Sequence, residues 1–167
     1  MSLHADLLQQ ARQLATNEPR RPRQASVRRA ISAAYYALSH LLLDEAATRL
    51  VAAKERSVHQ NLVRRSMTHS RMKEAANAFS SHRTSRPRWL AQSGMVLAPE
   101  IQVVAAAFVA LQDMRHRADY DLSAPVWRSD ALEAVALATA GFEAWATVRK
   151  TPAADLLLLA MVVDPRG

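Results

Sequence analysis

The sequence predicts an all-α fold, and three observations lead to that prediction. The chain has only 3 glycines and 5% aromatic residues, whereas Ala, Leu, Arg and Glu, which lose little side-chain entropy in a helix, are abundant. Apolar residues recur at steps of three or four, the spacing that places them on one helix face. With 167 residues, the chain has the length of one domain and can bury about two-thirds of the surface that it exposes when unfolded.

The N-terminal part predicts a helix, a basic turn and a second, longer helix. The first helix covers residues 2–16 and carries on one face Leu3, Leu7, Leu8, Ala11 and Leu14. Pro19 and Pro22 interrupt the helical pattern, and the arginines beside them (Arg20, Arg21 and Arg23) should be exposed, in a connector or in an arm that contacts phosphate.

The second helix is predicted over residues 26–53, with Ser26 as its N-cap. Its apolar stripe consists of Val27, Ile31, Tyr35, Leu38 and Leu42, whereas Arg28 and Arg29 can stay in water. Tyr36 and His40 lie one turn apart on a neighbouring face. They can hydrogen-bond each other, point at a common partner, or line the edge of the core.

The middle of the chain has a weaker pattern. Residues 54–79 predict one or two short helices, and residues 80–93 predict a loop because they are rich in Ser, Arg and Pro. Trp89 in this loop can anchor it to the core or stack on a base.

Three helices are expected in the C-terminal part. Pro99 is a suitable first residue for a helix that reaches residue 121, with an apolar seam of Ile101, Val104, Phe108 and Leu111. The next helix, residues 129–150, carries along one side Leu132, Val135, Thr139, Phe142 and Trp145. An apolar helix at residues 153–163 follows, too short to span a bilayer, and we expect it to pack against the domain or a second subunit rather than a membrane.

Charge and composition narrow the classes of function. A formal net charge of +7 and a pI near 10.7 favour a polyanionic partner such as a nucleic acid, although arginine-rich helix surfaces are also common as solvated faces. The chain has no cysteine, which excludes disulfides and fits a reducing cytosol, and its N-terminus lacks a signal-peptide pattern, so we expect a cytoplasmic protein. We expect no metal and no other cofactor, because there is no glycine-rich phosphate loop and the histidines lack metal-site spacing: His4, His40, His59, His69, His82 and His116.

The segment RHRADYD, residues 115–121, is the candidate functional site. The apolar seam of the helix that begins at Pro99 continues to Arg115, which must be paired, open to a cleft or ready for an anion. Three pairs have the spacing of one helical turn: Arg115 with Asp119, His116 with Tyr120, and Arg117 with Asp121. Acidic residues near a helix C-terminus oppose the helix dipole, so the cluster is either a functional site or a structural ion-pair network.

Three segments resemble the HEPN (higher eukaryote and prokaryote nucleotide-binding) family. RRAISAAYYALSHLLL (residues 28–43) is similar to its tyrosine-bearing long helix, MRHRADYDL (residues 114–122) to its signature helix end, and HSRMKEAANAF (residues 69–79) to a segment between them. The resemblance covers residues 23–150, with residues 151–167 as an apolar C-terminal helix and tail of the same single domain, residues 1–167. It implies an antiparallel bundle of four or five helices that pairs into a homodimer, with two signature helices at a shared cleft.

The resemblance also implies a function. Many HEPN proteins are metal-independent endoribonucleases, or toxins and defence components, in which an arginine holds the scissile phosphate and a histidine, separated from it by four to six intervening residues, transfers a proton. Here Tyr120 stands where that histidine begins to be expected, so catalysis stays open. In an enzyme, Arg115 would hold phosphate, His116 or Tyr120 would transfer protons and Asp119 would orient a neighbour.

Two interpretations therefore remain. In the first, the protein acts on RNA through Arg115, Arg117, Tyr36 and His40, and an antitoxin or a nucleotidyltransferase-like protein is a candidate partner. In the second, it is a non-catalytic interaction or dimerisation module whose charged cluster is structural.

Overall fold

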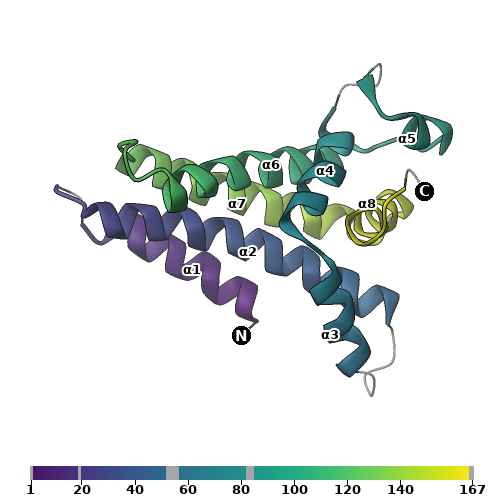
Figure 1. Cartoon of the computed structure of the whole chain (residues 1–167), viewed down its shortest axis with the longest axis horizontal. Coiled ribbons are helices and arrows are strands. Elements are labelled where there is room, and N and C mark those ends of the chain that lie inside the picture. Colours follow the sequence, from purple (N-terminus) through teal and green to yellow (C-terminus); the bar gives the residue numbers. More distant parts are fainter. Residues whose placement is uncertain (1, 19, 52–56, 82–84, 166–167) are drawn as a thin grey trace. The chain divides into compact units, whose positions relative to one another are not determined.

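A computed structural model describes residues 2–18, 20–51, 57–81 and 85–165, and within these ranges the chain forms eight α-helices and no strand. Figure 1 labels the helices in chain order. They are α1 (Leu3–Thr16), α2 (Gln24–Leu50), α3 (Ser57–Ser66), α4 (His69–Ser80), α5 (Arg88–Gln92), α6 (Pro99–Tyr120), α7 (Arg128–Val148) and α8 (Pro152–Val162). The predicted all-α class is confirmed.

The helices contribute to two compact units. The first comprises Met1–His40 and Ala107–Phe142, and the second comprises Leu41–Ala106 and Glu143–Gly167. Because the boundaries fall inside α2, α6 and α7, each of these three helices supplies residues to both units. The candidate site, residues 115–121, belongs to the first unit.

The predicted stripes of α2 and α6 are confirmed. Every residue of both stripes has a relative exposure of 1% or less: Val27, Ile31, Tyr35, Leu38, Leu42, Ile101, Val104, Phe108 and Leu111. Local periodicity was sufficient here because bulky side chains mark the buried face of both helices.

The predicted apolar side of α7 is wrong in its first part. Leu132 is exposed, and the face buried in the first unit consists of small residues: Ala131, Ala134, Ala138 and Gly141. A β-carbon built on Gly141 would lie 3.1 Å from each δ-carbon of Leu38. The absence of a side chain at this position therefore lets α7 approach the buried leucine of α2 closely.

In the second unit, α8 packs on α4. The apolar C-terminal segment buries six residues: Ala153, Ala154, Leu157, Leu158, Ala160 and Met161. On α4 the buried residues include Met72 and Phe79. The expectation that this segment packs against the rest of the chain is confirmed.

Other boundaries differ from the prediction. Within the expected loop, α5 forms a short helix whose buried Leu90 makes it part of the core, and Trp89 lies with its ring centroid 6.0 Å from that of Phe79. By contrast, α3 buries none of its side chains. The helix α2 begins two residues before Ser26, whereas its predicted end at residue 53, Pro19 and His82 lie outside the described residues.

Within the described part of the chain, α7 is long and apolar enough, by length and composition alone, to cross a membrane, and 39% of its apolar stretch is buried. Core helices of globular proteins share this length and composition.

Candidate functional site

The end of α6 is held by an arginine of α2. Arg28 donates from Nη1 to the carbonyl oxygens of Ala118 at 2.7 Å and Asp121 at 3.0 Å, and from Nη2 to that of Ala124 at 2.7 Å. The Ala118 carbonyl belongs to the last turn of α6 and the other two follow the helix, in the region where backbone acceptors lack helical partners and the helix dipole is negative. The expectation that Arg28 stays in water is therefore wrong, because its guanidinium caps α6.

The acidic residue that ends the motif serves the turn after the helix. Asp121 Oδ1 accepts hydrogen bonds from the hydroxyl of Ser123 at 2.7 Å and from the amides of Ser123 at 3.2 Å and Ala124 at 3.1 Å. The Ser123 hydroxyl, followed by the Ala124 amide, lowers the pKa of the Asp121 carboxyl. The unfavourable position of this acid at a helix C-terminus is thus compensated locally.

Arg115 occupies the position in the α6 seam that the periodicity predicts. Only 15% of its side chain is exposed, and its Nε lies 2.8 Å from Oδ2 of Asp119, the predicted ion pair. Its Nη2 donates to the hydroxyl oxygens of Tyr36 at 2.8 Å and Tyr120 at 3.2 Å. Three groups from two helices therefore hold the guanidinium, Tyr36 and Tyr120 by hydrogen bonds to Nη2 and Asp119 by its charge beside Nε.

All three tyrosines of the chain surround this guanidinium. The Arg115 Cζ lies 5.8, 5.5 and 5.1 Å from the ring centroids of Tyr35, Tyr36 and Tyr120. Such contacts stabilise a cation by about 0.5–2 kcal/mol each, the larger values applying away from water. Tyr35 is fully buried, and burial raises the pKa of its phenol to about 12.

The surroundings of Arg115 favour its charged form. Burial acts to lower the pKa of the guanidinium, but Tyr36, Asp119 and Tyr120 outweigh this effect and raise it. Nε and Nη2 are engaged, whereas Nη1 has no hydrogen bond or ion pair to any described residue. The side chain is thus oriented and charged, and it keeps one nitrogen with two N–H groups for an external anion.

Arg115, Asp119 and the three tyrosines form a cluster that we call the arginine centre. The remaining predicted site residues lie next to this centre, with one exception. Asp119 also accepts a 2.5 Å hydrogen bond from Ser32, the His116 ring lies 5.1 Å from that of Tyr120, and the His40 ring lies 6.3 Å from that of Tyr36. The exception is Arg117, whose predicted pairing with Asp121 is wrong. Its Nη2 lies 3.4 Å from Oδ2 of Asp130 on α7 instead.

Sequence reasoning missed two members of the site, Arg28 and Ser32. Ser32 is buried on an otherwise apolar part of α2, and a buried hydroxyl generally has a hydrogen-bond partner. That pattern could have signalled a polar contact, but not that the partner is Asp119 of a helix 87 residues away. Arg28 carried no comparable signal.

A hollow of about 390 Å³ adjoins the centre, between α1 and α2. Its lining consists of Leu7, Gln10, Leu14, Arg29, Ser32, Ala33 and Tyr36. Ser32 is hydrogen-bonded to Asp119, and Tyr36 is hydrogen-bonded to Arg115. The hollow is therefore lined by two residues that also contact the arginine centre.

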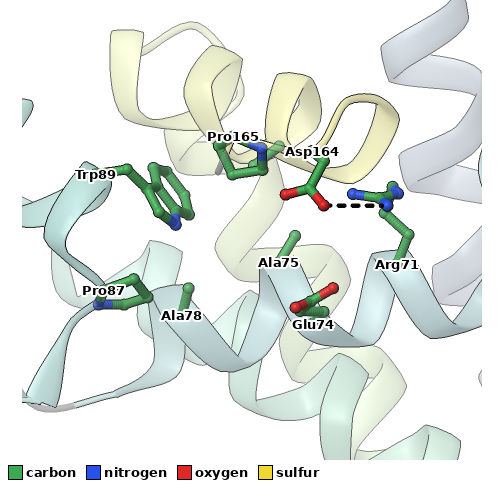
Figure 2. Close-up of a pocket in the computed structure, with 9 residues that line it drawn as sticks. Arg71, Glu74, Ala75, Ala78, Pro87, Trp89, Asp164 and Pro165 are labelled. Carbon is green, nitrogen blue, oxygen red and sulfur yellow. Dashed lines mark ion pairs between the residues drawn. The ribbon is translucent and has the colours of Figure 1, made fainter. Parts of the chain in front are cut away.

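Another hollow, of about 300 Å³, lies in the second unit between α4, α5 and the C-terminal segment. Figure 2 shows the Trp89 ring at one side and, at the other, the ion pair between Arg71 and Asp164, whose nitrogen and oxygen are 3.6 Å apart. Because Trp89 also contacts Phe79, its position agrees with the anchoring role that the sequence allowed.

Comparison with known proteins gave no match: neither a family model, nor a curated protein, nor a solved structure is similar enough to assign this chain. Among the described residues, no three His, Asp or Glu side chains come together as a group that could hold a metal ion.

Proposed function

We propose that this chain is a HEPN-like protein that acts on RNA, with Arg115 as the residue that binds a phosphate of the strand. The observation that carries the proposal is the state of Arg115: charged, fixed by Asp119 and Tyr36, and left with Nη1 unengaged. An oriented guanidinium binds phosphate with little further loss of side-chain freedom. The net charge of +7 supports a polyanionic ligand.

Within this proposal the reaction is metal-independent cleavage of the RNA strand. The 2′-oxygen forms a bond to phosphorus while the bond from phosphorus to the 5′-oxygen breaks. One group accepts the 2′-hydroxyl proton and another protonates the leaving 5′-oxygen. Arg115 stabilises the charge on the phosphoryl oxygens. His116 is the candidate for proton transfer, because it is exposed and its ring packs on Tyr120, whose hydroxyl is bonded to Arg115.

The protein works as a homodimer in this proposal, with two helix ends facing one RNA strand. Support comes from two exposed apolar residues in the segment between α6 and α7: Leu122 is 80% exposed and Trp127 is 64% exposed. Large apolar side chains exposed within one short segment are candidates for a contact surface. An antitoxin or nucleotidyltransferase-like protein would be the additional partner if the chain is a toxin.

A second candidate function rests on the same exposed residues. If Leu122 and Trp127 bind another protein, the chain is a non-catalytic interaction module and the Arg115 centre only stabilises the end of α6. Tyr120, which is exposed although its hydroxyl contacts Arg115, would then belong to the interface.

Incubation with total RNA in EDTA distinguishes these functions. Wild-type protein is compared with Arg115→Ala, His116→Ala and a charge control, Arg65→Ala. Arg65 is exposed on α3 and has no partner among the described residues. We expect cleavage by wild type and Arg65→Ala, and at least 100-fold slower cleavage by the other two, as for loss of a general acid–base group or of an oxyanion donor.

If RNA binding depends on Arg115 but no cleavage occurs, the proposal of RNA recognition stands and the proposal of nuclease activity is wrong. Equal RNA binding by wild type and Arg115→Ala, with circular dichroism showing both folded, would overturn the proposal and favour the interaction module.

A further inference from the structure

The hollow between α1 and α2 continues the arginine centre along one face of α2. Arg29, Ser32, Ala33 and Tyr36 are spaced by three, four and seven residues, so they lie on the same side of the helix. Arg29 and Tyr36 are about 10 Å apart along the helix axis, from the rise of 1.5 Å per residue. Tyr36 stands at the end where the hollow meets Arg115.

The residues that line the hollow provide the kinds of group that bind one nucleotide of single-stranded RNA. Leu7, Leu14 and Ala33 provide apolar surface, Tyr36 provides an aromatic ring, and Gln10 provides an amide that both donates and accepts. Arg29 is exposed at the rim, and no ion pair or hydrogen bond joins its side chain to the described part of the chain. A volume of about 390 Å³ falls within the range of small-ligand sites, about 300–1,000 Å³.

We propose that this hollow binds the ribonucleotide next to the phosphate that Arg115 holds. Its base lies against Tyr36 with an edge at the amide of Gln10, and Arg29 binds the following phosphate. The inference rests on the proposed function, since it extends the same strand from Arg115 into the hollow. The observation specific to this inference is the position of Tyr36, which is hydrogen-bonded to Arg115 and also lines the hollow.

A single strand fits this arrangement better than a duplex. Bases of single-stranded RNA are free to stack on aromatic side chains and to expose their edges, whereas a paired base in a duplex is not. The strand would place one base in the hollow and two phosphates on Arg115 and Arg29. The site would therefore recognise an unpaired nucleotide through its base as well as its charge.

The test is to compare two oligonucleotides of equal charge. One is a hexamer of 2′-fluoro nucleotides, which lack the attacking hydroxyl, and the other is the same hexamer without bases. Affinities are measured by calorimetry in EDTA. We expect wild type to bind the base-bearing hexamer about 5- to 150-fold more tightly, as for the stacking of one base on an aromatic side chain.

Substitutions test whether the difference between the two affinities arises from the hollow. Tyr36→Leu and Gln10→Ala should bring the ratio of the two affinities towards one, whereas Tyr36→Phe, which keeps the ring, should preserve that ratio. Arg29→Ala should weaken both oligonucleotides equally and reduce the dependence of log affinity on log salt by about 0.7. Arg65→Ala, which removes the same charge elsewhere, should leave both affinities and their salt dependence unchanged.

The outcomes separate this inference from the proposed function. If wild type binds both hexamers equally and Arg115→Ala binds neither, the nucleotide site is overturned and phosphate binding at Arg115 stands. If wild type binds neither hexamer, both proposals fail. If the preference for bases survives in Tyr36→Leu, the base binds elsewhere and the inference is wrong.

Discussion

At the scale of single residues, Arg115 explains how a charge can occupy an apolar seam. The neighbouring seam residues Leu111 and Ala118 are both buried, yet the guanidinium is compensated by Asp119 and by hydroxyl groups of two tyrosines. A cation left unpaired at this depth would destabilise the fold by several kcal/mol. The arginine is tolerated because its neighbours on α2 and α6 are tyrosines, which offer an apolar ring and, at Tyr36 and Tyr120, a hydroxyl oxygen.

The tyrosine with the shifted pKa gives a prediction at this scale. Burial raises the pKa of Tyr35 from 10.0 to about 12. The neutral phenol therefore contributes stability below pH 10, and this contribution is lost as the pH rises through 12. In an absorbance titration, native protein should show a tyrosine ionisation near pH 12 that is absent from Tyr35→Phe and moves to about pH 10 in urea.

Far-ultraviolet circular dichroism recorded at each pH serves as the control that the fold persists during the titration. A native titration that shows no ionisation near pH 12 while the helices stay intact would contradict the burial of the Tyr35 hydroxyl.

At the scale of elements, the end of α6 depends on Arg28 more than on its own sequence. Arg28→Ala should lower the free energy of unfolding by about 2–3 kcal/mol, because hydrogen bonds from a charged group contribute about 1.5–3 kcal/mol and water replaces part of the loss. Arg29→Ala is the matched control, since the adjacent residue is exposed and has no partner in the described ranges; it should change stability by less than about 0.5 kcal/mol. Urea denaturation measures both.

Equal effects of the two substitutions would mean that Arg28 does not cap α6 in solution. Faster amide hydrogen exchange at residues 118–120 in Arg28→Ala than in wild type would locate the effect at the end of α6.

The C-terminal helix α8 offers a second comparison between neighbours. Leu158 is 2% exposed and Leu159 is 42% exposed. Replacing the buried leucine with alanine should destabilise the protein by about 2–5 kcal/mol, because the transfer energy is lost and a cavity remains. The same change at Leu159 should have an effect below about 1 kcal/mol. Thermal unfolding of both variants checks this, and a larger loss at Leu159 would indicate that α8 presents its other face to α4.

At the scale of the whole molecule, three helices link the two units. Because α2, α6 and α7 each supply residues to both, neither unit can unfold completely without breaking a helix of the other. We predict one cooperative transition. Hydrogen exchange should show that Leu158→Ala lowers the protection of the slowest amides in residues 30–38 as much as in residues 154–161. Loss of protection confined to the second segment would show that the units unfold separately.

The parts of this fold that the sequence could predict are those fixed by local spacing. The stripes of α2 and α6 and the ends of α1, α6 and α8 follow from bulky apolar residues, proline and helix period. The buried face of α7 was misassigned because Leu132 outweighed Ala131 and Ala134 in the pattern. Small residues give little hydrophobic signal although they permit the closest packing.

The centre itself was predicted only in part, for a similar reason. The pair of Arg115 with Asp119 lies within one helix and follows from its period. The contacts of Arg115 with Tyr36, of Ser32 with Asp119 and of Arg28 with α6 depend on how α2 lies along α6. The hollow depends in addition on α1. Spacing along one helix contains no information on its neighbours.

The gathering of all three tyrosines around Arg115 also makes the site observable without interference from the rest of the protein. Growth on 3-fluorotyrosine would give a fluorine NMR spectrum with three resonances, all from this centre. Fluorine shifts respond to nearby charge and to ring stacking, so any ligand that reaches the guanidinium should move these lines. Candidate RNAs, nucleotides and partner proteins could then be screened in mixtures before any activity is known.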